Sequence, residues 1–166
     1  MDFDSIYKKY YAELYSFAIK QNHFQSDTSD ILQDVFTELY KKLKSGIHIE
    51  NPRAWLYKVL LNSIRTENRI TKARVTKNNE ITSLTELSAD SGNAFFEKER
   101  RKIVESCLAQ LFTEEKNLLL LYHQGFSYRE ISEILNIGYT SVGTYIARAT
   151  KKLKSILIAQ YHELFE

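Results

Sequence analysis

The fold that the sequence predicts is decided by residues 126–150, FSYREISEILNIGYTSVGTYIARAT. The stretch reads as two short helices, and Ser127 and Glu130 have the spacing of a capping box at the start of the first. Phe126 occupies the position of a hydrophobic staple just before that cap. Residues 136–138 supply a short turn before the second helix. Two helices joined by a turn of about three or four residues predict a helix-turn-helix, whose second helix enters the major groove of DNA.

The second helix of this motif offers side chains suited to DNA along its exposed start. Short hydroxyls and aromatic edges there can approach base edges in a major groove. Basic side chains further along can meet phosphates, which supply affinity and register but carry no sequence information. The alternative is a helical hairpin in a structural protein, but the capping box, the staple and the basic residues occur together and favour DNA binding. The candidate residues of the motif are Tyr128, Arg129, Tyr139, Thr140, Ser141, Thr144, Tyr145, Arg148, Lys151 and Lys152.

Gly143 lies inside the same helix. Glycine at such a position costs about 1 kcal/mol relative to alanine. A close approach of the backbone to DNA or to the neighbouring helix would explain it, and the alternative is that it has no particular role.

Composition places the whole chain in the helical class. Its 166 residues allow one large domain or two small ones, and a hydrophobic content of 43% is enough for a packed core. One Pro and five Gly favour helices over an all-β sandwich or barrel. The single cysteine, Cys107, excludes an internal disulfide and a cysteine-rich zinc site. No window approaches the ~18 apolar residues of a membrane span, and the acidic N-terminus MDFDS does not resemble a signal peptide. We therefore expect a cytoplasmic protein without membrane insertion.

Apolar periodicity predicts an all-α chain of two small helical domains. The N-terminal half reads as three amphipathic helices, of which the second opens near Asp27 and the third begins at Asn51-Pro52. Residues 75–93, VTKNNEITSLTELSADSGN, are polar and break the pattern. We interpret them as a flexible linker between an N-terminal domain over 1–74 and a helix-turn-helix domain over 94–166. The alternative is a long surface loop inside one domain.

Charge is unevenly distributed although the net charge is only +2. Residues 53–77 hold seven basic side chains and one acidic side chain, and residues 134–162 hold four basic and none acidic. Residues 27–38 hold four acidic side chains and no basic one. A single charge run is most often a solvated helix face. Here the two basic regions coincide with the motifs that carry the functional interpretation.

Three stretches together resemble a family. SDILQDVFTELYKKL is similar to the segment with which bacterial RNA polymerase sigma factors of the extracytoplasmic-function type grip core polymerase. RAWLYKVLLNSIR resembles their segment that melts and reads the minus-ten element. SYREISEILNIGYTSVGTYIARATKKL resembles the domain that reads the minus-thirty-five element. The resemblance covers nearly the whole chain and implies a promoter-specificity subunit with no catalytic residues, no cofactor and no metal.

The resemblance also assigns residues to the first two of these roles. It implies contact with core polymerase by Asp30, Gln33, Asp34, Phe36 and Glu38, and contact with the minus-ten region by Arg53, Tyr57, Lys58, Asn62, Arg65 and Arg69. Asn62 matches the position that lines a pocket for an extruded base, and its amide suits a Watson–Crick edge. Phe36 fits a core position as well as a contact. Of the two aromatic residues near Asn62, Trp55 fits the core and Tyr57 is the better exposed candidate.

Core RNA polymerase, promoter DNA and an anti-sigma factor are the partners that the resemblance implies. One alternative is a helix-turn-helix transcriptional regulator that binds an operator without replacing the sigma subunit. A second is a helical protein-interaction module with no role on DNA. An enzyme is disfavoured, because no phosphate-binding loop or catalytic triad can be assembled from the spacing of the residues. The four histidines are also scattered along the chain, at His23, His48, His123 and His162.

Overall fold

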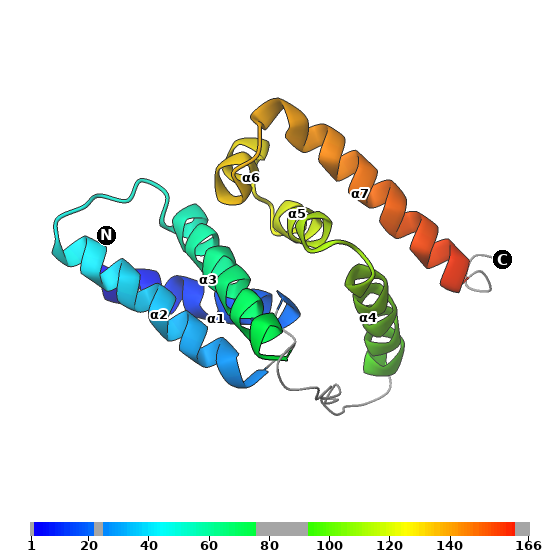
Figure 1. Cartoon of the computed structure of the whole chain (residues 1–166), viewed down its shortest axis with the longest axis horizontal. Coiled ribbons are helices and arrows are strands. Elements are labelled where there is room, and N and C mark those ends of the chain that lie inside the picture. The colour runs from blue at the N-terminus through cyan, green and yellow to red at the C-terminus, as the bar shows by residue number, and fades with distance from the viewer. Residues whose placement is uncertain (1, 22–24, 76–92, 162–166) are drawn as a thin grey trace. The chain divides into compact units, whose positions relative to one another are not determined.

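The computed structural model describes residues 2–21, 25–75 and 93–161. Seven α-helices make up the regular structure of these residues, and no strand occurs among them, which confirms the all-α prediction. No helix within the described ranges is both long and apolar enough to cross a membrane. In chain order the helices are α1 (Phe3–Gln21), α2 (Gln25–Lys44), α3 (Pro52–Val75), α4 (Asn93–Ala109), α5 (Thr113–His123), α6 (Tyr128–Leu135) and α7 (Tyr139–Gln160) (Figure 1).

The chain divides into two compact units, Met1–Thr85 and Glu86–Glu166. The first contains α1 to α3 and the second contains α4 to α7. The expected linker over 75–93 lies outside the described residues except for its two ends. Val75 ends α3 and Asn93 begins α4, so both ends are helical.

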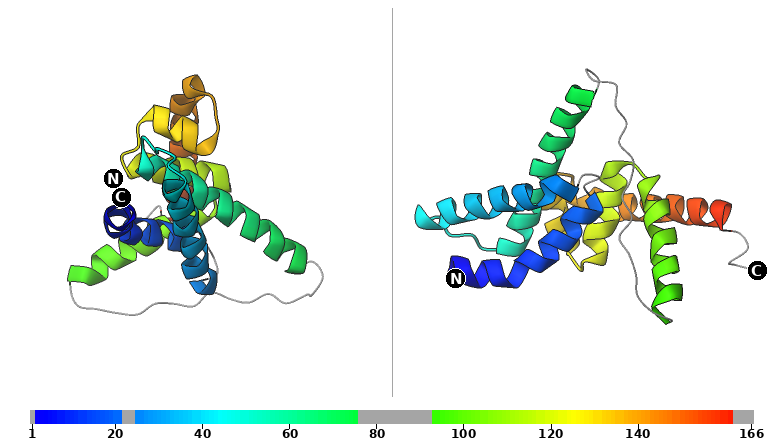
Figure 2. Two further views of the ribbon diagram at one scale, coloured as in Figure 1. Left: turned by 90° about the vertical axis from the view of Figure 1, so that its left-hand side faces the viewer. Right: turned by 90° about the horizontal axis from the view of Figure 1, so that it is seen from below.

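The first unit is built from three helices that each pack against the other two (Figures 1 and 2). Asn51 and Pro52 begin α3 as predicted, because the backbone N–H of Ala54 donates to Asn51 Oδ1 over 3.1 Å. Gly46 follows the end of α2 with φ +78°, a conformation that glycine adopts without strain. The fully buried centre combines residues of all three helices, among them Leu14, Phe17, Leu32, Leu39, Leu56 and Leu60.

The second unit packs α4, α5 and α6 against the long helix α7. The predicted capping box begins α6: the N–H of Glu130 donates to Ser127 Oγ over 3.3 Å, and the N–H of Ser127 donates to Glu130 Oε2 over 2.8 Å. Asn136 ends α6 in the left-handed conformation with φ 55°, and Gly138 is the N-cap of α7. The helix-turn-helix prediction is therefore confirmed, and α7 continues from this turn as one unbroken helix (Figure 2).

Candidate functional site

A polar and cationic stripe runs along α3. Lys58, Asn62, Arg65 and Arg69 are all exposed. They are spaced by four, three and four residues, which places them on one face of a helix with 3.6 residues per turn. The carboxamide of Asn62 thus lies between cations on both sides. We call these four residues the α3 stripe.

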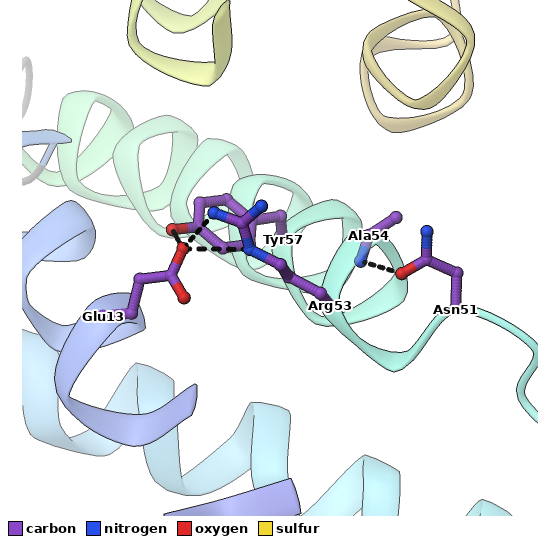
Figure 3. A network of polar contacts seen from close by, with 5 residues as sticks. All are labelled: Glu13, Asn51, Arg53, Ala54 and Tyr57. Atoms are coloured by element: carbon purple, nitrogen blue, oxygen red, sulfur yellow. Dashed lines mark hydrogen bonds and ion pairs between the residues drawn. The ribbon is translucent and has the colours of Figure 1, made fainter. Parts of the chain in front are cut away.

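Two other minus-ten candidates of α3 lie outside this stripe, and the expectation that Tyr57 is exposed was wrong. The Tyr57 side chain is 0% exposed, and its hydroxyl donates to Glu13 Oε1 of α1 over 2.9 Å (Figure 3). Arg53 donates to the same oxygen through Nε over 3.0 Å and through Nη2. The spacing of residues 57, 60, 61 and 64 is that of a buried helix face, and this signal could have shown that Tyr57 packs inward.

The cluster of Glu13, Arg53 and Tyr57 is a closed polar contact between α1 and α3, and we call it the Glu13 clasp. Burial together with the neighbouring Glu13 carboxylate raises the pKa of Tyr57 well above its usual value, while Arg53 acts in the opposite direction. Tyr57 is therefore neutral and serves as a hydrogen-bond donor. The guanidinium of Arg53 faces a carboxylate of its own unit. Trp55, expected in the core, is half-buried, and the Lys42 Nζ lies 5.9 Å from its ring centroid.

The acidic candidates of α2 form an exposed face, and Phe36 does not belong to it. Asp30, Gln33, Asp34 and Glu38 are exposed. Phe36 is only 3% exposed, and its ring packs edge-on against that of Tyr7, with centroids 4.7 Å apart. Among residues whose side chains the structure describes, no group of three or more His, Cys, Asp or Glu could hold a metal ion.

The start of α7 presents hydroxyl and cationic side chains on the face opposite the core. Thr140, Thr144, Arg148 and Lys151 are exposed, and their spacing of four, four and three residues places them on one helix face. We call these four residues the α7 stripe. The buried residues of the same helix are Val142, Ile146 and Ala149. Tyr139 and Tyr145 are 60% and 42% exposed.

Lys152 differs from the other candidates of α7, because its ammonium is engaged within the unit. Lys152 Nζ donates to Glu115 Oε2 of α5 over 2.7 Å and lies 4.0 Å from the centroid of the Phe112 ring. The hydrogen bond from Lys152 lowers the pKa of Glu115 below its usual value, although partial burial acts in the opposite direction. On α6, Arg129 is exposed and makes a solvated ion pair with Glu133. Arg129 is the more exposed of these two cations, with 85% of its side chain exposed against 37% for Lys152.

The close approach predicted for Gly143 is to the neighbouring helix. A Cβ atom at Gly143 would lie 3.3 Å from Cε2 of Tyr128 on α6. Tyr128 is 39% exposed, and its ring centroid lies 6.1 Å from that of Tyr122. The absence of a side chain at Gly143 therefore lets the Tyr128 ring rest on α7.

Comparisons with known proteins identify the family of both units. Residues 6–74 match the family model for sigma-70 region 2, and residues 101–153 match the model for sigma-70 region 4. The chain is 26% identical over 154 residues to RNA polymerase sigma factor YlaC of Bacillus subtilis, covering 91% of this chain and 89% of YlaC. It is 25% identical over 157 residues to the ECF RNA polymerase sigma factor SigM of the same organism, covering 94% and 95%.

Solved structures show the same fold. The sigma factor RpoE from Bartonella quintana, solved in complex with the anti-sigma factor NepR, superposes with a TM-score of 0.77 at 22% identity over 94% of this chain and 96% of RpoE. CnrH, solved with the cytosolic domain of CnrY, superposes with a TM-score of 0.65 at 24% identity over 95% and 88%. Region 2 coincides with the unit that carries the α3 stripe, and region 4 coincides with the unit that carries the α7 stripe. The chain belongs to the sigma-70 family of RNA polymerase sigma factors, within its extracytoplasmic-function group, whose members direct promoter-specific initiation of transcription.

Proposed function

We propose that three faces of this chain have separate binding roles in promoter recognition. The exposed face of α2 binds core RNA polymerase, the α3 stripe captures the opened minus-ten region, and the start of α7 reads the minus-thirty-five element. The domain boundaries that go with this division are 1–74 and 94–166, with a linker over 75–93. Polymerase then fixes the separation of the two domains, and that separation selects promoters by their spacing.

The face of α2 suits a protein partner with basic side chains. Asp30, Asp34 and Glu38 are exposed carboxylates within three turns of one helix. Opposite charges across an interface steer encounter and fix register. Gln33, exposed between them, adds an amide that can both donate and accept hydrogen bonds.

The α3 stripe suits a separated DNA strand. Lys58, Arg65 and Arg69 are cations spaced along about three turns, and such a row can follow a phosphate backbone. The exposed Asn62 amide between them can pair with the Watson–Crick edge of an unstacked base. Opening a duplex costs a few kcal/mol per unstacked base, and capture of the base together with the phosphate contacts offsets that cost.

The start of α7 suits a major groove. The hydroxyls of Thr140 and Thr144 are exposed on the face of the helix opposite the core, and Ser141 is half-buried beside them. Tyr139 and Tyr145 extend the polar surface on either side. Arg148 and Lys151 lie further along the same face, where they would meet phosphates.

In this proposal the chain contributes binding and strand capture, and polymerase carries out the chemistry. The chain is therefore not an enzyme and has no catalytic residue or cofactor of its own. It acts in the cytoplasm, where polymerase and promoter DNA are its partners. An anti-sigma factor is a third partner that we propose, since the similar sigma factor from Bartonella quintana was solved in complex with one.

One observation supports the proposal above the others: both DNA-facing surfaces are open. Asn62 is exposed, and Tyr139 at the start of α7 is 60% exposed. Burial of either one in a hydrophobic interior would have been incompatible with polynucleotide binding. The cations of the α3 stripe and the α7 stripe are exposed as well, so each unit presents its own cationic face to solvent.

Run-off transcription with purified core polymerase on a library of promoters tests the proposal. The chain should direct specific initiation, and Asn62→Ala should lower it strongly. Lys20→Ala, a change at an exposed cation of α1, is the control and should have no effect. A chain that shifts operator DNA without polymerase and never directs initiation would instead be a helix-turn-helix regulator.

A further inference from the structure

An aromatic groove lies between α1 and α2 and is not explained by the faces described so far. Its volume is about 460 Å³, and its walls include the rings of Phe3, Tyr7, Tyr11, Phe36 and Tyr40. Two polar side chains of α2, Gln33 and Thr37, complete one edge. A pocket of this size can hold a large side chain of another protein.

Some of the rings that line this groove are partly exposed to solvent. Phe36 is buried beneath, and Tyr7 and Tyr40 are 38% and 48% exposed. Tyr7 packs against Tyr11 with centroids 5.0 Å apart, and Phe3 packs edge-on against Tyr40 with centroids 5.5 Å apart. The ring packing holds the walls in place, so a guest would not have to order them on binding.

The groove is continuous with the face of α2 that we propose as the polymerase-binding surface. Gln33 and Thr37 are four residues apart on α2 and line the groove. Asp30 precedes Gln33 by three residues and Asp34 precedes Thr37 by three, so the carboxylates and the groove edge are neighbours on the helix surface. A partner that covers the acidic face therefore also covers the mouth of the groove.

We propose that the aromatic groove receives an arginine side chain from the segment of core RNA polymerase that docks on α2. This inference rests on the function proposed above for α2. Aromatic faces attract cations, and a planar guanidinium stacks on rings while remaining more weakly hydrated than an ammonium. The exposed carboxylates of Asp30 and Asp34 beside the groove add attraction for the same charge. On α2 the Nζ of Lys44, four residues after Tyr40, lies 5.8 Å from the centroid of the Tyr40 ring, a contact that helix geometry provides.

Binding of the full chain to core polymerase, measured at equilibrium with a fluorescent label, tests this proposal. Tyr7→Leu and Tyr40→Leu keep apolar bulk but remove the ring, and each should weaken binding about tenfold, as expected for an aromatic anchor. Tyr7→Phe and Tyr40→Phe keep the ring and should bind like the wild type. Thermal unfolding of each variant verifies that the fold is intact.

Tyr15→Leu is the matched control. Tyr15 lies on the same helix, is 37% exposed and stacks on Tyr11 with centroids 6.1 Å apart, but it does not line the groove. This variant should bind polymerase with unchanged affinity. If Tyr15→Leu weakens binding as much as Tyr7→Leu, the groove has no special part in the interface and the proposal fails.

Several outcomes separate this inference from the function on which it rests. If Asp34→Asn weakens binding while both leucine variants bind normally, the groove proposal is overturned and the proposed function stands. If the phenylalanine variants are as weak as the leucine variants, the hydroxyls rather than the ring faces bind the guest, and the stacking of a guanidinium on these rings is overturned. Sedimentation that shows a dimer broken by Tyr40→Leu assigns the groove to a second copy. If the wild type does not bind polymerase at all, the proposed function fails and this inference fails with it.

Discussion

In both units, one cation of a candidate DNA-binding helix is held by a carboxylate of a neighbouring helix. On α3, Arg53 is held by Glu13, and on α7, Lys152 is held by Glu115. Both carboxylates are 28% exposed, and the two contacts differ in their third partner: the Glu13 clasp includes the fully buried ring and hydroxyl of Tyr57. The contact of Lys152 instead lies near Phe112, whose side chain is 70% exposed. From this comparison we predict that Arg53 and Lys152 stabilise their units, and that the exposed cations of the α3 stripe and the α7 stripe bind DNA.

Of the changes considered, removal of Glu13 should have the largest effect on the stability of its unit. Glu13→Ala takes away the acceptor of Tyr57 and of Arg53, and a buried group left without its partner costs about 1–3 kcal/mol, more when charge is involved. We expect the free energy of unfolding of the first unit to fall by about 2–3 kcal/mol. Urea unfolding followed by the fluorescence of Trp55, the one tryptophan of the chain, reports on this unit. An unchanged midpoint would show that the clasp does not stabilise the unit.

Salt dependence should sharpen the distinction between free and engaged cations. Each lost phosphate contact lowers the slope of log affinity against log salt by about 0.7 for a single strand and about 0.9 for duplex DNA. Arg65→Ala and Arg148→Ala should therefore each lower the slope by about that amount when the assembled holoenzyme binds promoter DNA. Lys152→Ala should leave the slope unchanged because its ammonium already pairs with Glu115. Equal slopes for Arg148→Ala and Lys152→Ala would contradict the distinction between free and engaged cations.

Gly143 offers a smaller test inside the helix-turn-helix. An alanine there gains up to about 1 kcal/mol of helix propensity. Its Cβ also meets the Tyr128 ring at 3.3 Å, so the ring must shift and the gain should nearly vanish. In a Tyr128→Ala background the full gain should return. A double-mutant cycle by thermal unfolding measures this coupling, and additive effects would show that the ring yields freely.

The smallest effect concerns pH and the contact of Lys152 with Glu115. The pKa of Glu115 is lowered in the folded chain, so the contact stabilises the fold above the ordinary pKa of glutamate. That contribution should disappear as the pH falls through the lowered value. Lys152→Met should reduce this part of the pH dependence of stability. A titration of Glu115 by NMR that shows its ordinary pKa would contradict the expectation.

Local features of the fold could be predicted from the sequence, because neighbours in the chain determine them. The capping box of Ser127 and Glu130, the helix start at Asn51-Pro52 and the left-handed turn at Gly46 each depend on residues a few positions apart. The exposed stripe of Lys58 to Arg69 follows from helical period in the same way. The roles of its side chains on DNA remain predictions.

Contacts between distant parts of the chain could not be predicted in this way. Glu13 lies 40 residues from Arg53 and 44 from Tyr57, and nothing in the local pattern of either segment indicates the pairing. The same holds for Lys152 and Glu115, which are 37 residues apart. Such pairs depend on how helices cross, which the spacing of apolar residues within one helix does not specify. For this reason the sequence did not show that Arg53 and Lys152 each pair with a carboxylate of their own unit, and the role of both cations on DNA stays a prediction.

A single carboxylate oxygen of Glu13 holds two side chains from the first two turns of α3 (Figure 3). Glu13 shares its helix with Tyr7 and Tyr11, which line the groove beside α2. Together with the packing of Phe17 against Tyr57, whose ring centroids are 4.8 Å apart, Glu13 therefore fixes the helix that carries two walls of the groove to the start of the helix that carries the α3 stripe.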